Sequence, residues 1–324
     1  MSAPWRRPLT RAAKLVLTLL LVAYLLDRVD LREAFALMAG ADGAPLAAAF
    51  LIFGISVLAG AWQWGRLLAA LGIRLTRRKL LELYWVGLFF NNFMPGNVGG
   101  DVIKVLDLKR SDQDPVASSA ATLADRLTGL GALAFLSFLA SWRLSADASL
   151  APLARPVFWG SLVFLGVLAL FLLDPVARAL RLAAQMAGLL PSAGLRARVL
   201  EQLRMLRRRR RLIVQLFLFS LLVQALRVGV HYWVGASLLG PERPGLLDCF
   251  LVVPPLAFAL ILPITLGGLG WRENLAVPLY APLGVQAEAA VAIQLLAYLL
   301  MLLASLLGGL LYLLRRTQTG KGLV

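Results

Sequence analysis

LFFNNFMPGNVGGDVIKV, residues 88–105, is the stretch on which the predicted architecture rests. It begins apolar, breaks at a run of asparagine, proline and glycine, and resumes with the charged residues Asp101 and Lys104. A second stretch, LILPITLGGLGWREN at residues 260–274, has the same skeleton: a proline, three further residues, then Gly-Gly and charge. Two interrupted apolar segments at matching places in two halves of a chain indicate a transporter-like membrane site.

The two stretches align at their turns with one constant sequence separation. The aligned pairs are Pro95 with Pro263, Gly99 with Gly267, and Gly100 with Gly268. Glycine permits positive φ angles and close backbone approach, and proline stops the preceding half-helix. Freed amides and helix ends beside a cavity can bind an anion or a polar headgroup. A plain helix-breaking turn at the membrane surface is the alternative for either stretch alone, and the repetition favours a site.

The composition is that of an integral membrane protein. Of the 324 residues, 60% are hydrophobic, and the mean hydropathy is +0.79, which is typical of transmembrane chains. The formal net charge is +16, but the basic residues lie in short blocks between apolar runs. That distribution is the positive-inside pattern, so we expect no nucleic-acid partner. The lone Cys249 allows no internal disulfide and is expected to be buried.

Six apolar runs predict full transmembrane helices, and two broken segments predict re-entrant hairpins. The expected spans are residues 12–26, 44–65, 116–140, 157–173, 212–239 and 287–314. The hairpins are residues 80–106 and 249–283; the apolar part of the first is shorter than the roughly 20 residues that a span needs. Flanking basic residues indicate that the first hairpin returns to the cytoplasm, whereas the second should dip in from outside. Trp62 and Trp64 are placed like an interfacial belt.

The order span, span, hairpin, span occurs twice with opposite orientation, which predicts an inverted repeat. We therefore expect an all-α integral membrane protein with about six full transmembrane helices plus two re-entrant helical hairpins. It would be a single transmembrane domain over residues 1–324, with inverted halves at about 1–145 and 155–324. A basic connector, residues 175–211, would be cytoplasmic, as would both termini.

Ionisable groups inside a span are costly, so they mark functional or paired positions. The third predicted span contains Asp125 and Arg126. Arg126 could pair with Asp101 or Glu273, and a structural ion pair is the alternative to a functional role. Asp101 and Lys104 lie three residues apart, so in a helix they share one face and can pair.

The fifth predicted span carries a polar stripe on an otherwise apolar helix. Ser220, Gln224, Arg227 and His231 recur at helical spacing, so they should face the bundle interior or a water-filled path. An arginine near mid-span suits an anionic group such as phosphate. His231 could move a proton, and a satisfied interior histidine is the alternative.

The candidate substrate-binding residues lie in the two hairpins and in the two polar spans. They are Asn91, Asn92, Pro95, Gly99, Gly100, Asp101, Lys104, Asp125, Arg126, Gln224, Arg227, His231, Pro263, Gly267, Gly268, Arg272 and Glu273. Signatures of hydrolases, ATP-binding loops and zinc proteases do not occur, and one histidine with one cysteine gives no metal-ligand spacing. We therefore expect no catalytic residue, no metal, no cofactor and no enzymatic activity.

Three blocks, NNFMPGNVGGDVIKVLDLKR, ATLADRLTGL and LPITLGGLGWREN, resemble the lysylphosphatidylglycerol synthase transmembrane-domain family. That family includes flippase-like proteins and the membrane half of bacterial enzymes that make and flip aminoacylated phosphatidylglycerol. The positions that match its motifs are Pro95, Gly99, Gly100, Asp101, Asp125, Arg126, Pro263, Gly267, Gly268, Arg272 and Glu273. Lys104 stands where the first motif often carries arginine. Because the soluble aminoacyl-transferring domain is absent from this sequence, the resemblance implies the translocating part without the synthetic part.

The expected function is that of a lipid translocase, or flippase-like protein, of the bacterial inner membrane. It would move a lipid with a polar, anionic or phosphate-bearing headgroup between leaflets, with Arg126, Arg227 and Arg272 meeting the headgroup. The alternative is a non-transporting membrane subunit that assists a lipid-modifying or glycosyl-transferring enzyme. The expected partners are membrane lipids and, in the second case, such an enzyme.

Overall fold

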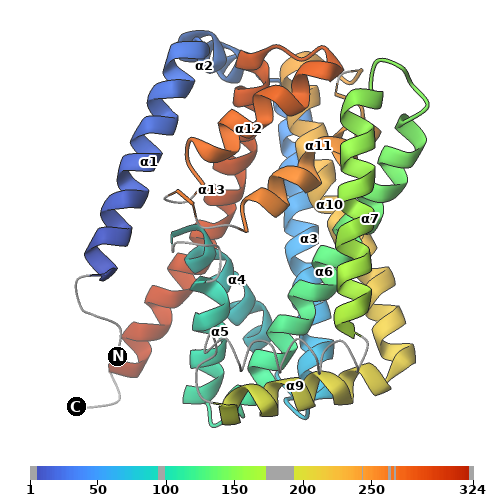
Figure 1. Ribbon diagram of the computed structural model, residues 1–324. Coiled ribbons are helices and arrows are strands. Elements are labelled where there is room, and N and C mark those ends of the chain that lie inside the picture. Colours follow the sequence, from blue (N-terminus) through green and yellow to red (C-terminus); the bar gives the residue numbers. More distant parts are fainter. Residues whose placement is uncertain are drawn as a thin grey trace. The chain divides into compact units, whose positions relative to one another are not determined.

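Every regular element in the described part of the chain is a helix (Figure 1). The computed structural model describes residues 6–93, 99–172, 193–242, 244–261, 264–265 and 268–320. The long helices are α1 (Arg6–Arg28), α3 (Gly43–Ala70), α6 (Pro115–Leu144), α7 (Ala151–Leu172), α10 (Arg210–Leu239) and α13 (Ala287–Gly320). The shorter ones are α2 (Leu31–Ala39), α4 (Arg77–Phe93), α5 (Gly99–Arg110), α9 (Ala193–Arg208), α11 (Leu246–Ala259), α12 (Trp271–Tyr280) and the 3-10 turn η2 (Ala281–Leu283). The predicted all-α class is confirmed.

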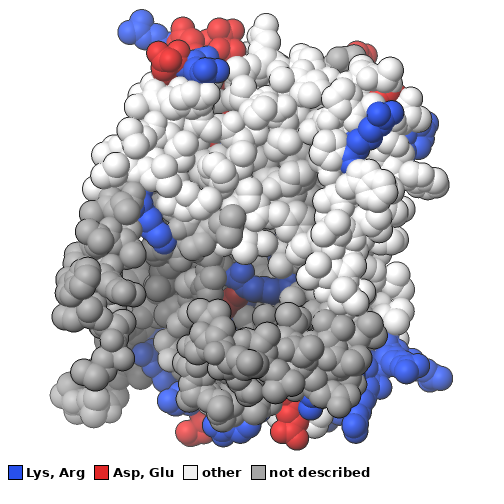
Figure 2. All heavy atoms as spheres, viewed as in Figure 1, with Lys and Arg blue, Asp and Glu red and all other residues white. Residues whose placement is uncertain are grey.

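Five helices among the described residues are long and apolar enough to cross a membrane. They are Gly43–Ala70, Pro115–Leu144, Ala151–Leu170, Arg210–Leu239 and Ala287–Arg315, which coincide with five of the six expected spans. The remaining expected span, residues 12–26, lies within the 23-residue helix α1 and stays a prediction. On the face shown in Figure 2, most charged side chains gather at the top and bottom of the view, and a few lie between them among uncharged residues.

Both broken stretches fold as two helices separated by a break. The first consists of α4 and α5. The second consists of α11, which has 14 residues, and α12, which has 10. All four helices are shorter than the roughly 20 residues of a full span. In each stretch one helix therefore ends before the predicted break and another begins after it, whereas the depth of each hairpin and its side of entry stay predictions. Pro95, Pro263 and Gly267 lie outside the described residues.

The chain divides into two compact units that interleave along the sequence. The first, here called the hairpin unit, comprises Met1–Val57, Glu82–Lys104 and Leu226–Val324, and so it contains both helix breaks. The second, the connector unit, comprises Leu58–Leu81 and Val105–Ala225. The predicted halves follow the chain order instead, and their inverted symmetry stays a prediction.

Glycines let three helices of the hairpin unit approach at backbone distance. A Cβ added at Gly100 on α5 would overlap the carbonyl of Gly87 on α4. A Cβ added at Gly308 on α13 would overlap the carbonyl of Trp85, which is also on α4. Small residues at such crossings allow the close van der Waals packing on which membrane helices depend. Helix α4 is therefore held by α5 at one contact and by α13 at another.

The second broken segment of the hairpin unit is held together through its backbone. The indole Nε1 of Trp271 donates to the carbonyl of Ala259 at 3.3 Å, which ties the start of α12 to the end of α11. Asn274 Nδ2 donates to the carbonyl of Leu21 at 2.8 Å, so α12 also contacts α1. Figure 1 shows α12 beside α11 and α13. Gly270 has a φ of 75°, a left-handed value that favours glycine and sets the turn before α12.

In the connector unit, α6 packs against α7 and α9. Phe138 stacks on Phe158 at a ring-centroid distance of 4.9 Å, which joins α6 to α7. Helix α6 begins at an N-cap, because the Asp114 carboxylate accepts from the backbone amide of Val116 at 2.8 Å.

The interfacial position expected for both tryptophans of α3 is wrong for Trp64. Trp64 is fully buried, and its Nε1 donates to Thr122 Oγ1 on α6 at 3.1 Å. That placement is a correction to the sequence prediction, and its cause is the partner hydroxyl, which lets a buried indole satisfy its only donor. Trp62 is 48% exposed, as a residue at an interface would be.

Gly100→Ala should destabilise the protein by roughly 1–3 kcal/mol, because the new methyl group forces α4 and α5 apart. Gly54→Ala on α3 is the matched control, since a Cβ there meets nothing within 4 Å. Thermal unfolding in detergent, followed by tryptophan fluorescence, should show a lower midpoint for the first variant and an unchanged or higher one for the second. Equal midpoints for Gly100→Ala and the unaltered protein would contradict the crossing.

Candidate functional site

Two cationic side chains meet on one tyrosine inside the hairpin unit. The Lys104 Nζ lies over the ring of Tyr84 at 4.5 Å from its centroid, and Arg227 Nη2 donates to the Tyr84 hydroxyl at 3.2 Å. Tyr84 comes from α4, Lys104 from α5 and Arg227 from the middle of α10. Lys104 is 6% exposed and Tyr84 is 7% exposed. We call Tyr84, Asp101, Lys104 and Arg227 the Tyr84 centre.

The charges of the Tyr84 centre do not cancel. Lys104 Nζ lies 3.3 Å from Asp101 Oδ1, so the pair expected from the sequence spacing is formed. Arg227 is partly buried and has no carboxylate partner among the described residues. A cation withdrawn from water is costly unless an anion balances it. The centre therefore carries one positive charge in excess and is suited to an anionic ligand.

Local sequence holds the Tyr84 centre in place. A Cβ at Gly87 would lie 2.5 Å from Lys104 Cε, so a larger residue there would displace the lysine side chain. Asn91 Oδ1 accepts from the amide of Gly100 at 2.8 Å and thereby caps α5 across the helix break. The neighbouring Asn92 has a buried Nδ2 without a hydrogen-bond partner among the described residues. Tyr84, Gly87 and Asn91 lie on one face of α4 because their spacing is helical.

The second broken segment carries a neutralised cation. Arg272 Nη2 lies 2.7 Å from Glu273 Oε1, and the two side chains are only 7% and 2% exposed. Glu273 Oε2 also accepts from the amide of Gly270 at 2.8 Å, and the Arg272 guanidinium lies 4.4 Å from the ring centroid of Tyr298 on α13. Because a carboxylate and an aromatic face already satisfy Arg272, this pair locks the start of α12 rather than offering a free charge.

His231 lies one helical turn beyond Arg227 on α10. Its Nδ1 is 3.4 Å from the carbonyl of Arg227, and the ring is within electrostatic range of Arg272. His231 is therefore near Arg227 of its own helix and near Arg272 of the second broken segment.

A separate polar network lies in the connector unit. Gln63 on α3 donates from Nε2 to Asp125 Oδ1 at 2.9 Å and to Thr128 Oγ1 at 3.4 Å, and its Oε1 accepts from Ser220 Oγ at 3.0 Å. Gln224 Nε2 donates to the carbonyl of Gly129 at 3.1 Å. The network thus joins α3, α6 and α10 through neutral donors. Asp125 is held by hydrogen bonds in it.

The structure sorts the predicted residues into three groups. The first group belongs to or adjoins the Tyr84 centre and comprises Asp101, Lys104, Arg227, Asn91, Gly100 and His231. The second is the buried pair of Arg272 and Glu273. The third is the connector network, which contains Asp125 and Gln224. Asn92 and Gly99 flank the first helix break, Gly268 lies at the second break with a φ of 80°, and Arg126 follows Asp125 on α6. Asp101 pairs with Lys104 and Glu273 with Arg272, and the predicted pairing of Arg126 with Asp101 or Glu273 stays a prediction.

Sequence reasoning missed Tyr84, Gln63 and Tyr298. Tyr84 had a signal, because it shares a helix face with Gly87 and Asn91. Gln63 had one too, as an amide inside an apolar run. Among the described residues no cluster of histidine, cysteine, aspartate and glutamate could hold a metal ion.

The helices, the two breaks and the buried cations define a multi-pass helical membrane protein with a polar interior centre. The chain belongs to the family described as "Lysylphosphatidylglycerol synthase TM region", whose sequence model matches residues 11–309. A similar protein is the UPF0104 membrane protein PH1989 of Pyrococcus horikoshii. It is 26% identical over 325 residues, which cover 93% of this chain and 96% of the relative. The family resemblance seen in the sequence is therefore confirmed.

Glu273→Gln should destabilise the protein by about 3 kcal/mol, because it leaves the Arg272 charge buried and unpaired. Glutamine can still accept from the Gly270 amide, so the variant tests charge and not the cap. The double variant Arg272→Met/Glu273→Gln should recover most of the loss, since it removes both charges. Thermal midpoints in detergent measure both effects. A neutral Glu273→Gln variant would show that the pair contributes nothing.

Proposed function

We propose that this protein is a lipid translocase that moves a lipid with an anionic, phosphate-bearing headgroup between the leaflets of a cell membrane. The observation that carries the proposal is Arg227, a cation in the middle of an apolar helix whose described partner is the neutral Tyr84 hydroxyl. Intramembrane ionisable residues are functional by default. A phosphate oxygen is the ligand that a guanidinium binds best, through parallel hydrogen bonds.

Lys104 supplies the second contact of the proposed headgroup site. Its ammonium lies over the same tyrosine ring that binds Arg227, so one phosphate placed beside Tyr84 can meet both cations. Lysine acts there as a compact charge, whereas arginine sets the orientation. The acyl chains stay in the bilayer, so the protein needs to lower only the cost of carrying a charged headgroup through hydrocarbon.

Asp101 gives the site a way to release its ligand. Asp101 Oδ1 lies 3.3 Å from Lys104 Nζ. A bound phosphate competes with this carboxylate for the same ammonium, and Lys104 returns to Asp101 when the lipid leaves. Passage across a membrane requires a site that binds the headgroup weakly enough to release it and that leaves no unpaired charge afterwards.

The headgroup role assigned here to Lys104 and Arg227 narrows the set expected from the sequence. Arg272 is already balanced by Glu273, so its role is to hold α12. The proposed activity involves no covalent step, and the proposed location is the cytoplasmic membrane of a bacterium with both termini inside. The family match and the similar membrane protein support a membrane function without naming a lipid.

Arg227→Ala should slow lipid translocation roughly tenfold or more, because it removes the charge-assisted contact to the headgroup. The assay uses proteoliposomes with fluorescently labelled phosphatidylglycerol, and dithionite bleaches the label in the outer leaflet only. Arg227→Lys, which keeps the charge but loses the planar fork, should retain part of the rate.

Arg143→Ala is the matched control, since Arg143 is exposed near the end of α6 and its loss changes the net charge equally. Thermal midpoints of all variants separate lost function from lost folding. If Arg227→Ala is folded and moves lipid at the unaltered rate, the headgroup role is wrong. If the unaltered protein moves neither this lipid nor labelled phosphatidylethanolamine, a non-transporting subunit that assists a lipid-modifying or glycosyl-transferring enzyme is favoured.

The two helix breaks should be reached from opposite sides of the membrane. Cys249 is the only cysteine and is buried, so Cys249→Ser gives a background for single-cysteine labelling. Asn97→Cys should react with an impermeant maleimide in inside-out vesicles, and Leu269→Cys in right-side-out vesicles. Gln113→Cys and Asp147→Cys mark the two sides. Labelling of positions 97 and 269 from the same side would exclude opposed hairpins.

A further inference from the structure

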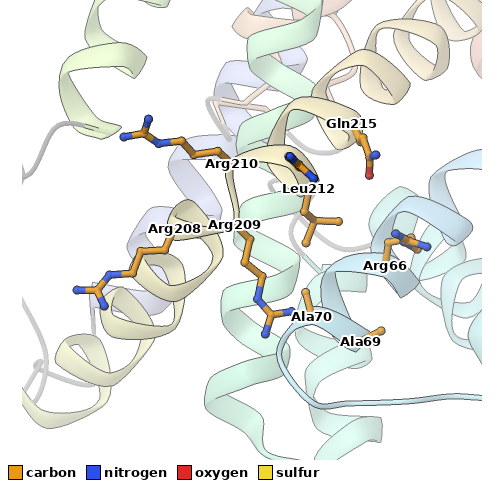
Figure 3. Close-up of a pocket in the computed structure, with 9 residues that line it drawn as sticks. Arg66, Ala69, Ala70, Arg208, Arg209, Arg210, Leu212 and Gln215 are labelled. Atoms are coloured by element: carbon orange, nitrogen blue, oxygen red, sulfur yellow. The ribbon is translucent and has the colours of Figure 1, made fainter.

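A second cationic feature lies in the connector unit, where α9 gives way to α10. A hollow of about 720 Å³ is lined there by Arg66 of α3 and by the four consecutive arginines 208–211. Figure 3 shows Arg209 extending toward Ala70 at the end of α3, while Arg208 and Arg210 extend to the other side. The described residues that line the hollow include no aspartate or glutamate.

The backbone creates this hollow by breaking the helix at Arg209. Helix α9 ends at Arg208 and α10 begins at Arg210. The Arg209 amide donates to the carbonyl of Leu206 at 2.9 Å, and its carbonyl accepts from the amide of Ile213 at 3.1 Å, so Arg209 stands at the helix start. The first turn of α10 contains no acidic residue. The positive end of the helix dipole therefore adds to the arginine charges.

The positive-inside rule explains the number of these charges but not why Arg66 and the arginines 208–211 line one hollow. That rule counts basic residues in a loop and requires no particular geometry. Here Arg66 arrives from a helix far away in the sequence, and its guanidinium lies 5.5 Å from the ring centroid of Trp62, which orients it. Over the residues that the structure describes, none of the arginines 208–211 pairs with a carboxylate. Like charges gathered without counter-charges favour binding of a polyvalent anion.

Apolar surface begins directly beside the arginines. Leu212 and Ala69 line the hollow itself. Along α10, Val214, Leu218 and Leu222 are 57%, 59% and 52% exposed, and their helical spacing places them on one face. This combination of cations at a helix end and exposed aliphatic side chains next to them matches an amphipathic ligand at the membrane–water boundary.

We propose that this arginine hollow binds the phosphate-bearing headgroup of an anionic membrane lipid, whose acyl chains lie along the exposed face of α10. The site shares no residue with the Tyr84 centre, and the proposal does not depend on lipid translocation. A soluble polyphosphate shares the headgroup chemistry but would leave the aliphatic face of α10 unused, so the lipid is the expected source.

The experiment titrates phosphatidic acid into the full-length protein in detergent and counts bound lipids by native mass spectrometry. Phosphatidylcholine, with the same acyl chains but a zwitterionic headgroup, is the reference lipid, and inorganic pyrophosphate is the soluble probe. The test variant is Arg66→Gln/Arg209→Gln. The matched control is Arg77→Gln/Arg78→Gln, which removes the same charge from exposed residues at the start of α4 outside the hollow.

We expect phosphatidic acid to bind more tightly than phosphatidylcholine, and the test variant to bind it roughly tenfold more weakly while the control changes little. Equal weakening in both variants would reduce the binding to diffuse net charge and overturn the site. Equal affinity for the two lipids would do the same. Tight binding of pyrophosphate without binding of phosphatidic acid would overturn the lipid as the source. Translocation rates are not part of this readout, so the two proposals fail independently.

Discussion

The backbone contact between Gly87 and Gly100 is the constraint on which the polar centre of the hairpin unit depends. Because α4 and α5 touch there, Lys104 lies over the ring of Tyr84, and Asn91 reaches the first amides of α5. A second close approach, at Gly308 of α13, fixes α4 from another direction. Membrane helices gain little from the hydrophobic effect between themselves, so such contacts carry much of the packing. The charged side chains of the centre are positioned by residues that have no side chain at all.

Two arginines of the hairpin unit, Arg272 buried and Arg227 partly buried, have very different partners. Arg272 has the Glu273 carboxylate at 2.7 Å, the ring of Tyr298 and a tight turn around it. Its positive charge is therefore neutralised and stabilises the structure. Arg227 has a phenol hydroxyl and lies in the middle of a long apolar helix. Burial of a charge without its counter-charge costs several kcal/mol, on the order of the stability of a whole domain. Such an arrangement is informative about ligands, whereas a fully paired cation is not.

Much of this architecture could be predicted from the sequence because the bilayer restricts what a chain can do. Apolar runs of sufficient length gave five helices of spanning length, and Pro-Gly-rich interruptions gave both helix breaks. The pairing of Asp101 with Lys104 followed from helical spacing alone. The partners that came from distant helices could not be derived in this way. Tyr84 under Lys104, Tyr298 under Arg272, and Gln63 between Asp125 and Ser220 are tertiary contacts, and spacing along one helix carries no information about them. The same limit explains why Trp64 was placed at an interface when Thr122 holds it inside.

The close packing of Lys104 against Gly87 limits which residues can stand at these two positions. Gly87 leaves just enough room for the lysine stem, since a Cβ there would come within 2.5 Å of Lys104 Cε. The residue at position 87 and the side chain at position 104 therefore compete for the same space. A larger residue on α4 would push the lysine side chain aside and so move its ammonium group away from the tyrosine ring. Bulk at this crossing would therefore remove one of the two cations from the Tyr84 centre.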